Sequence, residues 1–237
     1  MSPTAIPGNL LLKNGMVITG SEKNPVDLDR SNVSLLLHGD GANGSTTIVD
    51  SSPSPKTVTA VGNAQISTAQ SKFGGSSISC VTASDYLTIA SAGSASFRLD
   101  GDFTWETWIY KNVSGWHGIY TGDVISSPNF RIFSFSDDTL RVDIGGSGAG
   151  NYFGVIPTGS WAHIAVVRSS GSLQGYVNGV GGTPFASSFT VPNTANSRIG
   201  LVAGFLLNGY IDDFRITKGI ARYTSNFTPP TAPFPDI

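Results

Sequence analysis

The C-terminal part of the chain contains the stretch Asn208-Gly-Tyr-Ile-Asp-Asp-Phe-Arg-Ile-Thr-Lys-Gly-Ile-Ala-Arg-Tyr223, in which a turn signal leads directly into a strand. Asn208 and Gly209 both tolerate the positive φ that a primed hairpin turn requires. A strict alternation over 210–216 sorts the residues into two faces: Tyr210, Asp212, Phe214 and Ile216 on one, Ile211, Asp213 and Arg215 on the other. A strand with one buried face would hide one of the two adjacent carboxylates, so we expect a compensating partner for Asp212.

The segment after this strand is predicted to leave the sheet. Residues 219–223 can form one helical turn, and Pro229, Pro230, Pro233 and Pro235 then favour an extended exit that pairs with no strand.

Composition and turn spacing predict an all-β fold. Only 13% of the 237 residues are charged and 29 are glycine, which is typical of many short strands joined by turns. Strands are expected at 46–49, 56–61, 64–67, 76–81, 85–90, 103–110, 130–135, 139–144, 151–156, 161–168, 173–177, 185–191, 197–201 and 209–216. This spacing predicts a two-sheet antiparallel sandwich. Residues 103–110 carry aromatic side chains on both faces, so this strand should be central and covered on both sides.

Charge and apolar patterning argue against several classes of partner. The formal net charge is −2 and the basic residues are scattered singly, so no nucleic-acid footprint is present. No window is apolar enough for a membrane span, and the N-terminus lacks a signal-peptide pattern, so we expect synthesis in a cytoplasm. Cys80 is the only cysteine and alternates with its neighbours as a buried small residue would.

Residues 1–32 differ from the rest of the chain. A turn-rich start is followed by two short apolar runs, 10–12 and 16–18, on either side of Asn14-Gly15, which indicates one hairpin. A free, unstructured leader is the alternative. Because exposed apolar runs are unfavourable in a free tail, we interpret residues 1–32 as an arm that docks on a partner subunit, ahead of a domain over 33–237.

Several strings follow one another in the order of a known family: Ser34-Leu-Leu-Leu-His-Gly-Asp-Gly41, Ala69-Gln-Ser-Lys-Phe-Gly-Gly-Ser-Ser77, Gly101-Asp-Phe-Thr104, Trp161-Ala-His-Ile-Ala-Val-Val-Arg168, Gly209-Tyr-Ile-Asp-Asp-Phe-Arg-Ile216 and Phe227-Thr-Pro-Pro230. Together they resemble the laminin-G-like, concanavalin A-like jelly-roll domains common in bacteriophage virion proteins. The resemblance spans residues 33 to 235. It implies a jelly-roll sandwich and a virion setting, and it fits adhesins, carbohydrate-binding modules and companions of glycosidases.

Catalytic residues are sparse. The related lectin-like fold hosts glycosidases that use two carboxylates, but the only glutamates are Glu22, in the arm, and Glu106, in the strand 103–110. The sequence has no nucleophile-elbow string, Gly-x-Ser-x-Gly, to accompany its three histidines, His38, His117 and His163. We therefore expect a protein that is not an enzyme.

A structural calcium ion is the one cofactor that the residues suggest. The resemblance places a calcium ligand at Asp212, Asp40 in the glycine-rich loop 39–44 could pair with it, and Asp213 is the substitute ligand. The alternative is that these carboxylates bond to loop amides or to Arg215 and Arg222.

Glycan recognition would need exposed aromatic rings beside polar side chains. The candidates are Trp116, His117 and Tyr120 in the segment 111–123, and Tyr152. The alternative is that these rings anchor loops on the sandwich.

The leading hypothesis is a non-enzymatic accessory protein of the phage virion surface, in the capsid or the tail, made in the host cytoplasm. Residues 1–32 would dock it to other virion proteins, and the jelly roll would decorate the particle or contact host-surface glycans. A free carbohydrate-binding module is the second hypothesis and a glycosidase the third. An exposed edge strand could also pair with a second copy, giving a homo-oligomer.

Overall fold

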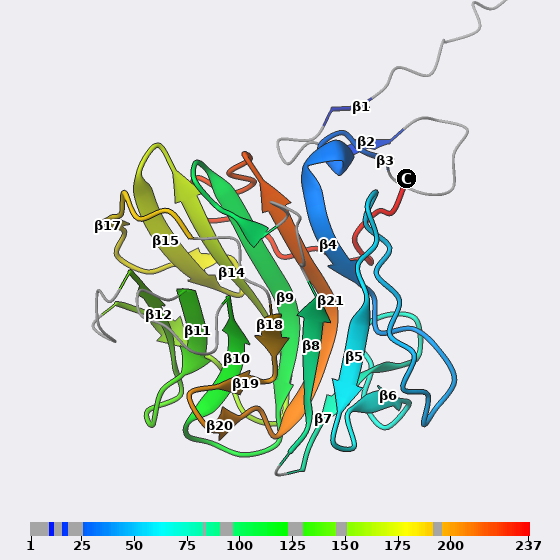
Figure 1. The fold of residues 1–237 in the computed structure, drawn as a ribbon. Coiled ribbons are helices and arrows are strands. Elements are labelled where there is room, and N and C mark those ends of the chain that lie inside the picture. Colours follow the sequence, from blue (N-terminus) through cyan, green and yellow to red (C-terminus); the bar gives the residue numbers. More distant parts are fainter. Residues whose placement is uncertain are drawn as a thin grey trace, which may run out of the picture.

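The computed structural model describes residues 10–11, 16–18, 26–82, 84–90, 97–122, 130–145, 151–191 and 196–237. Regular structure in these ranges is almost entirely strand, and a 3-10 turn, η1 (Arg30–Asn32), precedes β4. Two large sheets dominate the fold (Figure 1). No helix in the described ranges is both long and apolar enough to cross a membrane. The predicted all-β, two-sheet antiparallel sandwich is confirmed.

The first large sheet has seven antiparallel strands. They are β5 (Val58–Val61), β8 (Tyr86–Ala90), β10 (His117–Thr121), β11 (Phe130–Ser134), β12 (Thr139–Ile144), β13 (Tyr152–Val155) and β18 (Asn196–Ile199). Their order is β13-β12-β11-β10-β18-β8-β5. The alternation of the sequence did not predict β10, which lies in the glycine-rich segment 111–123, and its central place in the sheet changes the interpretation of that segment.

The second large sheet has nine strands. They are β4 (Val33–Leu37), β6 (Gln65–Ser67), β7 (Ser77–Cys80), β9 (Phe103–Lys111), β14 (Trp161–Ser169), β15 (Ser172–Val177), β16 (Val180–Gly181), β17 (Phe185–Ala186) and β21 (Gly209–Lys218). The main order is β16-β15-β14-β9-β21-β7-β6, with β17 beside β15 and β4 beside β21. β9 is central and buried on both faces, as predicted. Asn178 and Gly179 form the expected turn between β15 and β16, with φ of 50° and 78°.

Two small sheets complete the fold. β19 (Leu201–Val202) and β20 (Phe205–Leu206) form a hairpin, and β1 (Leu10–Leu11), β2 (Met16–Ile18) and β3 (Val26–Asp27) form a three-stranded sheet. Leu10 lies opposite Ile18, so the hairpin expected in the arm is confirmed. Figure 1 shows these three strands beside η1 and close to the C-terminus, where the Asp27 N–H donates to the Ile237 carbonyl at 3.0 Å.

The main core lies between the two large sheets. Trp105 from β9 is fully buried there, with Phe214 from β21 at 5.1 Å between ring centroids and Tyr120 from β10 at 5.8 Å. Cys80 is fully buried in the same core, as expected. The inward positions of β9 and β10 therefore hold the two sheets together through aromatic packing.

A β-bulge at Asp213 changes the faces of β21. Asp212 lies opposite Trp108 of β9, whereas Arg215 lies opposite Glu106, so β21 contains one extra residue, and Asp213 takes a φ of +49°. The bulge also marks where the partner strand changes from β7 to β4. Phe214 is consequently in the core, while Asp212 and Arg215 share the outer face. The strict alternation that grouped Asp212 with Phe214 is wrong at this point.

Residues 219–237 cover the outer face of the nine-stranded sheet without forming a helix or strand. Tyr223 stacks on Phe227 at 3.6 Å, and both pack over β14 and β15. The predicted helical turn over 219–223 does not form, because the side chain of Thr104 bonds the Ile220 carbonyl and the Arg222 N–H. The predicted exit that pairs with no strand is confirmed.

Candidate functional site

Trp116 lies immediately before β10 of the seven-stranded sheet and is partly exposed. Gly115, with φ of +115°, turns the chain into the strand, and the Trp116 side chain remains 37% exposed. Its ring stacks on Phe205 at 4.8 Å and 19° and contacts Phe135 at 4.0 Å. Phe133 also stacks on it at 5.8 Å and 10°. A partly exposed indole held by three further rings can contact the apolar face of a sugar ring.

The β19–β20 hairpin holds Phe205 in place. The hairpin crosses the outer face of the sheet at Gly118, where a Cβ atom would lie 2.2 Å from the Val202 nitrogen and 2.3 Å from the Phe205 carbonyl oxygen. Gly118 therefore has to be glycine for the hairpin to approach this closely. The hairpin turns at Ala203 and Gly204, which both have positive φ.

Arg141 and Tyr152 extend this surface along neighbouring strands. Arg141 of β12 lies opposite Phe133 of β11 and Tyr152 of β13, on the outer face. Its guanidinium lies 4.8 Å from the ring centroid of Phe135 and 5.7 Å from that of Tyr152, which is 52% exposed. We call Trp116, Phe135, Arg141, Tyr152 and Phe205 the aromatic surface. Exposed rings beside a guanidinium suit a ligand with apolar faces and hydroxyl groups.

His117 and Tyr120, predicted beside Trp116, are not available to a ligand. β10 turns them into the fold: Tyr120 is 2% exposed, and its hydroxyl donates to Ser197. Burial raises the pKa of Tyr120 to about 12 and lowers the pKa of His117. His117 Nε2 lies 2.8 Å from the Val113 carbonyl oxygen. Of the four glycan candidates the structure therefore brings only Trp116 and Tyr152 to one exposed surface.

Sequence reasoning did not identify Phe135, Arg141 and Phe205. The hairpin that carries Phe205 could have been predicted from Gly204, since a glycine between short apolar runs is typical of a hairpin turn. Phe135 and Arg141 gave no signal, because they come beside Trp116 and Tyr152 only through the pairing of β10, β11, β12 and β13.

Asp212 is a buried carboxylate with one oxygen unused. Its Oδ2 accepts the N–H groups of Lys72 at 2.7 Å and Phe73 at 3.1 Å, whereas Oδ1 is buried and has no hydrogen-bond partner among the described residues. Burial raises the pKa of Asp212 to about 7, and the charges of Asp213 and Asp40 add to the rise. A protonated carboxyl group or a bound cation would relieve this arrangement.

Asp40 lies beside Gly74, next to the 72–73 amides that bond Asp212, and Asp213 has other partners. The Asp40 carboxylate is so near Gly74 that a Cβ there would lie 1.9 Å from Oδ1. Asp213 already accepts the Phe234 N–H at 2.6 Å and lies 2.6 Å from His38 Nδ1. The described residues contain no group of three His, Cys, Asp or Glu side chains around one point, so a cation here would also need backbone carbonyls.

Glu106 belongs to a buried charge cluster on the outer face of the nine-stranded sheet. Its Oε1 accepts Arg215 at 2.8 and 3.0 Å, and its Oε2 accepts the Tyr223 hydroxyl at 2.8 Å, with His163 at 3.3 Å. The cluster also contains Asp27, which pairs with Arg215 and Arg222, and Arg222, whose Nε lies 4.0 Å from Glu106 Oε1.

Ion pairing holds Glu106 in its charged form. Burial alone would raise the pKa of Glu106, but Arg215, His163 and Arg222 outweigh it and hold that pKa well below its ordinary value. Glu106 is fully buried, so the one glutamate of the domain is a structural counterion in this fold.

The cluster also fixes residues 26–32 to the domain. The Asp27 carboxylate accepts Arg222 at 2.8 and 3.0 Å and Arg215 at 3.2 Å. Arg30 donates to the Ser51 carbonyl at 2.8 Å, and Asn32 donates to the Lys218 carbonyl at 3.0 Å. The last residues of the predicted arm therefore pack as part of the jelly roll.

Comparison with known proteins supports the same architecture. A family model described as the concanavalin A-like lectin/glucanases superfamily matches residues 81–221. No curated protein sequence matches the chain.

Among solved structures, the binding domain of botulinum neurotoxin serotype G superposes with a TM-score of 0.61 at 12% identity, over 81% of this chain and 49% of that one. The binding domain of botulinum neurotoxin DC in complex with SialylT gives 0.58 at 12% identity, over 82% and 50%. Domain 4 of AbnA, a GH43 extracellular arabinanase from Geobacillus stearothermophilus, in complex with arabinotriose, gives 0.56 at 20% identity, over 80% and 94%. The chain thus spans about half the length of the toxin binding domains.

Proposed function

The chain belongs to the concanavalin A-like lectin/glucanase superfamily, and on this basis we propose that it is a non-catalytic glycan-binding protein of a phage virion surface. The aromatic surface carries the proposal. It places three exposed or half-exposed rings and a guanidinium on one side of the seven-stranded sheet. The arabinotriose complex of AbnA domain 4, which aligns over most of its length, supports a carbohydrate ligand.

The position of Glu106 supports a non-catalytic role. A retaining or inverting glycosidase needs an acid that can exchange a proton with the glycosidic oxygen. Glu106 is fully buried, held in its charged form at neutral pH and bonded to an arginine and a tyrosine, so a sugar cannot reach it while the cluster is intact.

The virion setting comes from the family resemblance, and the arm provides the means of attachment. β1 and β2 extend from β3, which the charge cluster fixes to the jelly roll. Residues preceding β3 can therefore contact another virion protein without disturbing the sandwich. A free carbohydrate-binding module, the alternative, would use the same aromatic surface and need no arm.

A structural calcium ion at Asp212 and Asp40 is part of the proposal. The unpaired buried oxygen of Asp212 and the nearby Asp40 carboxylate fit a hard cation, which prefers oxygen ligands. Bound calcium would neutralise both carboxylates and connect the 39–44 loop, the 72–74 turn and β21.

Glycan binding is tested on a glycan array with the wild type and Trp116→Ala. Removal of the stacking indole should weaken binding by about tenfold or more. Trp161→Ala is the matched control, because Trp161 is also partly exposed but packs on Tyr110 at 5.7 Å in the nine-stranded sheet. No binding by the wild type, or equal loss in both variants, would contradict the proposed ligand site.

Docking is tested by deleting residues 1–25, which leaves Asp27 and its ion pairs in place. The shortened chain should fold with an unchanged melting temperature and fail to enter virus particles. Normal incorporation of the shortened chain would exclude docking through the arm and favour the free module.

A further inference from the structure

The turn between β11 and β12 places two carboxylates beside the rings of the aromatic surface. Asp137 and Asp138 occupy this turn, in which the Asp138 N–H donates to the Phe135 carbonyl at 3.0 Å and the Phe135 N–H donates to the Thr139 carbonyl at 2.9 Å. Asp138 takes a φ of +63°, which aspartate tolerates better than most residues. One turn therefore holds the Phe135 ring and both carboxylates.

Asp138 connects this turn to the loop that carries Trp116. Its Oδ1 accepts the N–H of Gly115 at 2.8 Å and also accepts the Lys111 ammonium. The Lys111 side chain is fully buried, whereas 20% of the Asp138 side chain is exposed. Burial alone would raise the pKa of Asp138, but the bonds from Lys111 and Gly115 outweigh it and lower that pKa, so the carboxylate is charged at neutral pH.

Asp137 pairs with Arg141 in a similar way. Its Oδ1 accepts the N–H of Thr139 at 3.1 Å and the Thr139 hydroxyl, and its Oδ2 lies 3.5 Å from Arg141 Nη2. The bond from the Thr139 hydroxyl lowers the pKa of Asp137. Arg141 Nε also donates to Thr139 at 2.8 Å, and the Arg141 side chain is 16% exposed against 54% for Asp137. In both ion pairs the carboxylate is thus the more exposed partner.

The exposed charge among these rings is consequently negative. The two ion pairs sum to zero, but an arriving ligand meets the groups that reach solvent, and these are the carboxylates of Asp137 and Asp138. Farther along the same two strands, Arg131 and Asp143 lie 3.7 Å apart and compensate each other. Carboxylates accept hydrogen bonds from hydroxyl groups and repel other carboxylates, sulfates and phosphates.

We propose that the aromatic surface selects neutral glycans and excludes glycans that carry an ionised acidic group. This inference rests on the proposed function and narrows its class of ligand. The rings of Trp116 and Tyr152 contact the apolar faces of a sugar, and the half-exposed carboxylate of Asp137 accepts its hydroxyl hydrogens. A uronic or sialic acid would bring a second negative charge to the same place, where Arg141 is already paired with Asp137.

The test is a glycan array probed with the full chain. The array includes two matched pairs, galactotriose with trigalacturonate and lactose with sialyllactose, and the methyl ester of trigalacturonate, which resembles the acid in shape but lacks its charge. Every glycan that the chain binds should be neutral, and an acidic member should bind about tenfold more weakly than its neutral counterpart, or not at all. An acidic glycan bound as tightly as its neutral counterpart would overturn the inference, whereas an array on which no glycan binds would contradict the proposed function itself.

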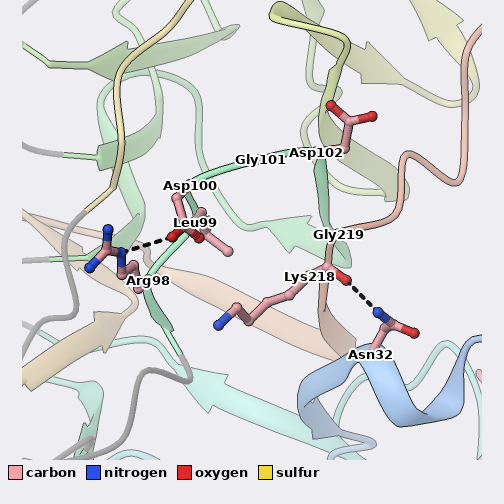
Figure 2. Close-up of a pocket in the computed structure, with 8 residues that line it drawn as sticks. All are labelled: Asn32, Arg98, Leu99, Asp100, Gly101, Asp102, Lys218 and Gly219. Atoms are coloured by element: carbon pink, nitrogen blue, oxygen red, sulfur yellow. Dashed lines mark hydrogen bonds and ion pairs between the residues drawn. The ribbon is translucent and has the colours of Figure 1, made fainter.

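Asp137→Asn distinguishes repulsion from poor fit. The substitution removes an exposed negative charge and the charged partner of Arg141, so the affinity for an acidic glycan relative to its neutral counterpart should rise about tenfold. Asp100→Asn is the matched control: Figure 2 shows Asp100 paired with Arg98, its side chain is 53% exposed, and it precedes β9, whereas Trp116 follows that strand. The control should leave the ratio unchanged, and an equally unchanged ratio in Asp137→Asn would overturn the role of this carboxylate.

Salt provides a measurement that needs no variant. Raising sodium chloride from about 0.01 M to about 1 M screens exposed charges, so the difference in wild-type affinity between trigalacturonate and its methyl ester should become smaller. The affinity for neutral glycans should change little over the same range. Thermal melting of both variants confirms folding. A difference that stays the same at about 1 M salt would overturn exclusion by charge and show that shape excludes the acid.

Discussion

Glu106→Gln should destabilise the domain strongly, because it removes one of the two carboxylates that compensate two buried arginines. Arg215 and Arg222 are almost completely buried, and in the wild type Glu106 and Asp27 accept their hydrogen bonds. In the variant, Asp27 would be the one carboxylate still hydrogen-bonded to the two guanidinium groups, with the Asp29 carboxylate 3.9 Å from Arg222. The glutamine would also have to replace a charged acceptor of Arg215 and of the Tyr223 hydroxyl with a neutral amide.

The magnitude follows from burial. Removing one partner of a buried ion pair costs about 3–5 kcal/mol. In a chain of this length each kcal/mol lowers the melting temperature by about 2–4 °C, so a fall of about 6–20 °C is expected. Asp100→Asn is the matched control: it breaks an ion pair that is 53% exposed on both sides and should cost about 1 kcal/mol or less.

The pH dependence supplies a second measurement. The pKa of Glu106 in the folded protein is held below its ordinary value of 4.5. Its contribution to the free energy of unfolding is therefore fully present above pH 4.5 and is lost as the pH falls further. In urea unfolding, the free energy of unfolding of the wild type should exceed that of Glu106→Gln by a constant amount from about pH 8 to about pH 5. This difference should become smaller below about pH 5. A melting temperature within about 2 °C of wild type would refute a structural role for Glu106. Polysaccharide hydrolysis that disappears in the variant would establish a catalytic one.

Three further predictions concern other parts of the fold. The pKa of Asp212 is raised to about 7, so the folded state binds a proton that the unfolded state has lost, and stability without calcium should fall as the pH rises from about 4 through 7. Calcium should reverse this loss of stability in the wild type but not in Asp212→Asn. Thermal melting in EGTA and in calcium measures both effects. Gly118→Ala should displace the β19–β20 hairpin, cost about 1–3 kcal/mol and remove glycan binding, with a change in tryptophan fluorescence; unchanged fluorescence and binding would contradict the close approach. Burial raises the pKa of the Cys80 thiol to about 12, so a thiol reagent should label it at pH 8 only after unfolding in guanidinium.

Part of the candidate site could be predicted because it depends on single side chains. Trp116 and Tyr152 were identified as aromatic residues in glycine-rich surroundings, and both reach the outer face. Tyr120 has the same local signal, yet it packs on Trp105 in the core. Tyr120 lies in the core and Trp116 on the surface because β10 is held between β11 and β18, and the sequence around β10 does not show which strands pair with it.

The two aspartates of β21 show the same limit. The sequence already indicated that two adjacent carboxylates in a strand are costly to bury. As expected, Asp212 has compensating partners, the N–H groups of Lys72 and Phe73. The bulge at Asp213 was not evident, because it arises where β21 changes from β7 to β4. One extra residue there reverses the face on which Phe214 lies.

The sequence by itself determined the all-β class, the central strand β9 and the turn at Asn178-Gly179, because alternation and positive φ depend on adjacent residues. The hairpin turn expected at Asn208-Gly209 does not form: Asn208 has a φ of 45°, but Gly209 is the first residue of β21, and β21 pairs with β4, β7 and β9 rather than with the preceding strand β20. Only the tertiary structure decided that Glu106 is a counterion and that the aromatic surface has five members. Each of these sites joins side chains that are distant in the chain. Their distances, and the burial that sets their charges, exist only once the two sheets and the C-terminal segment have packed together.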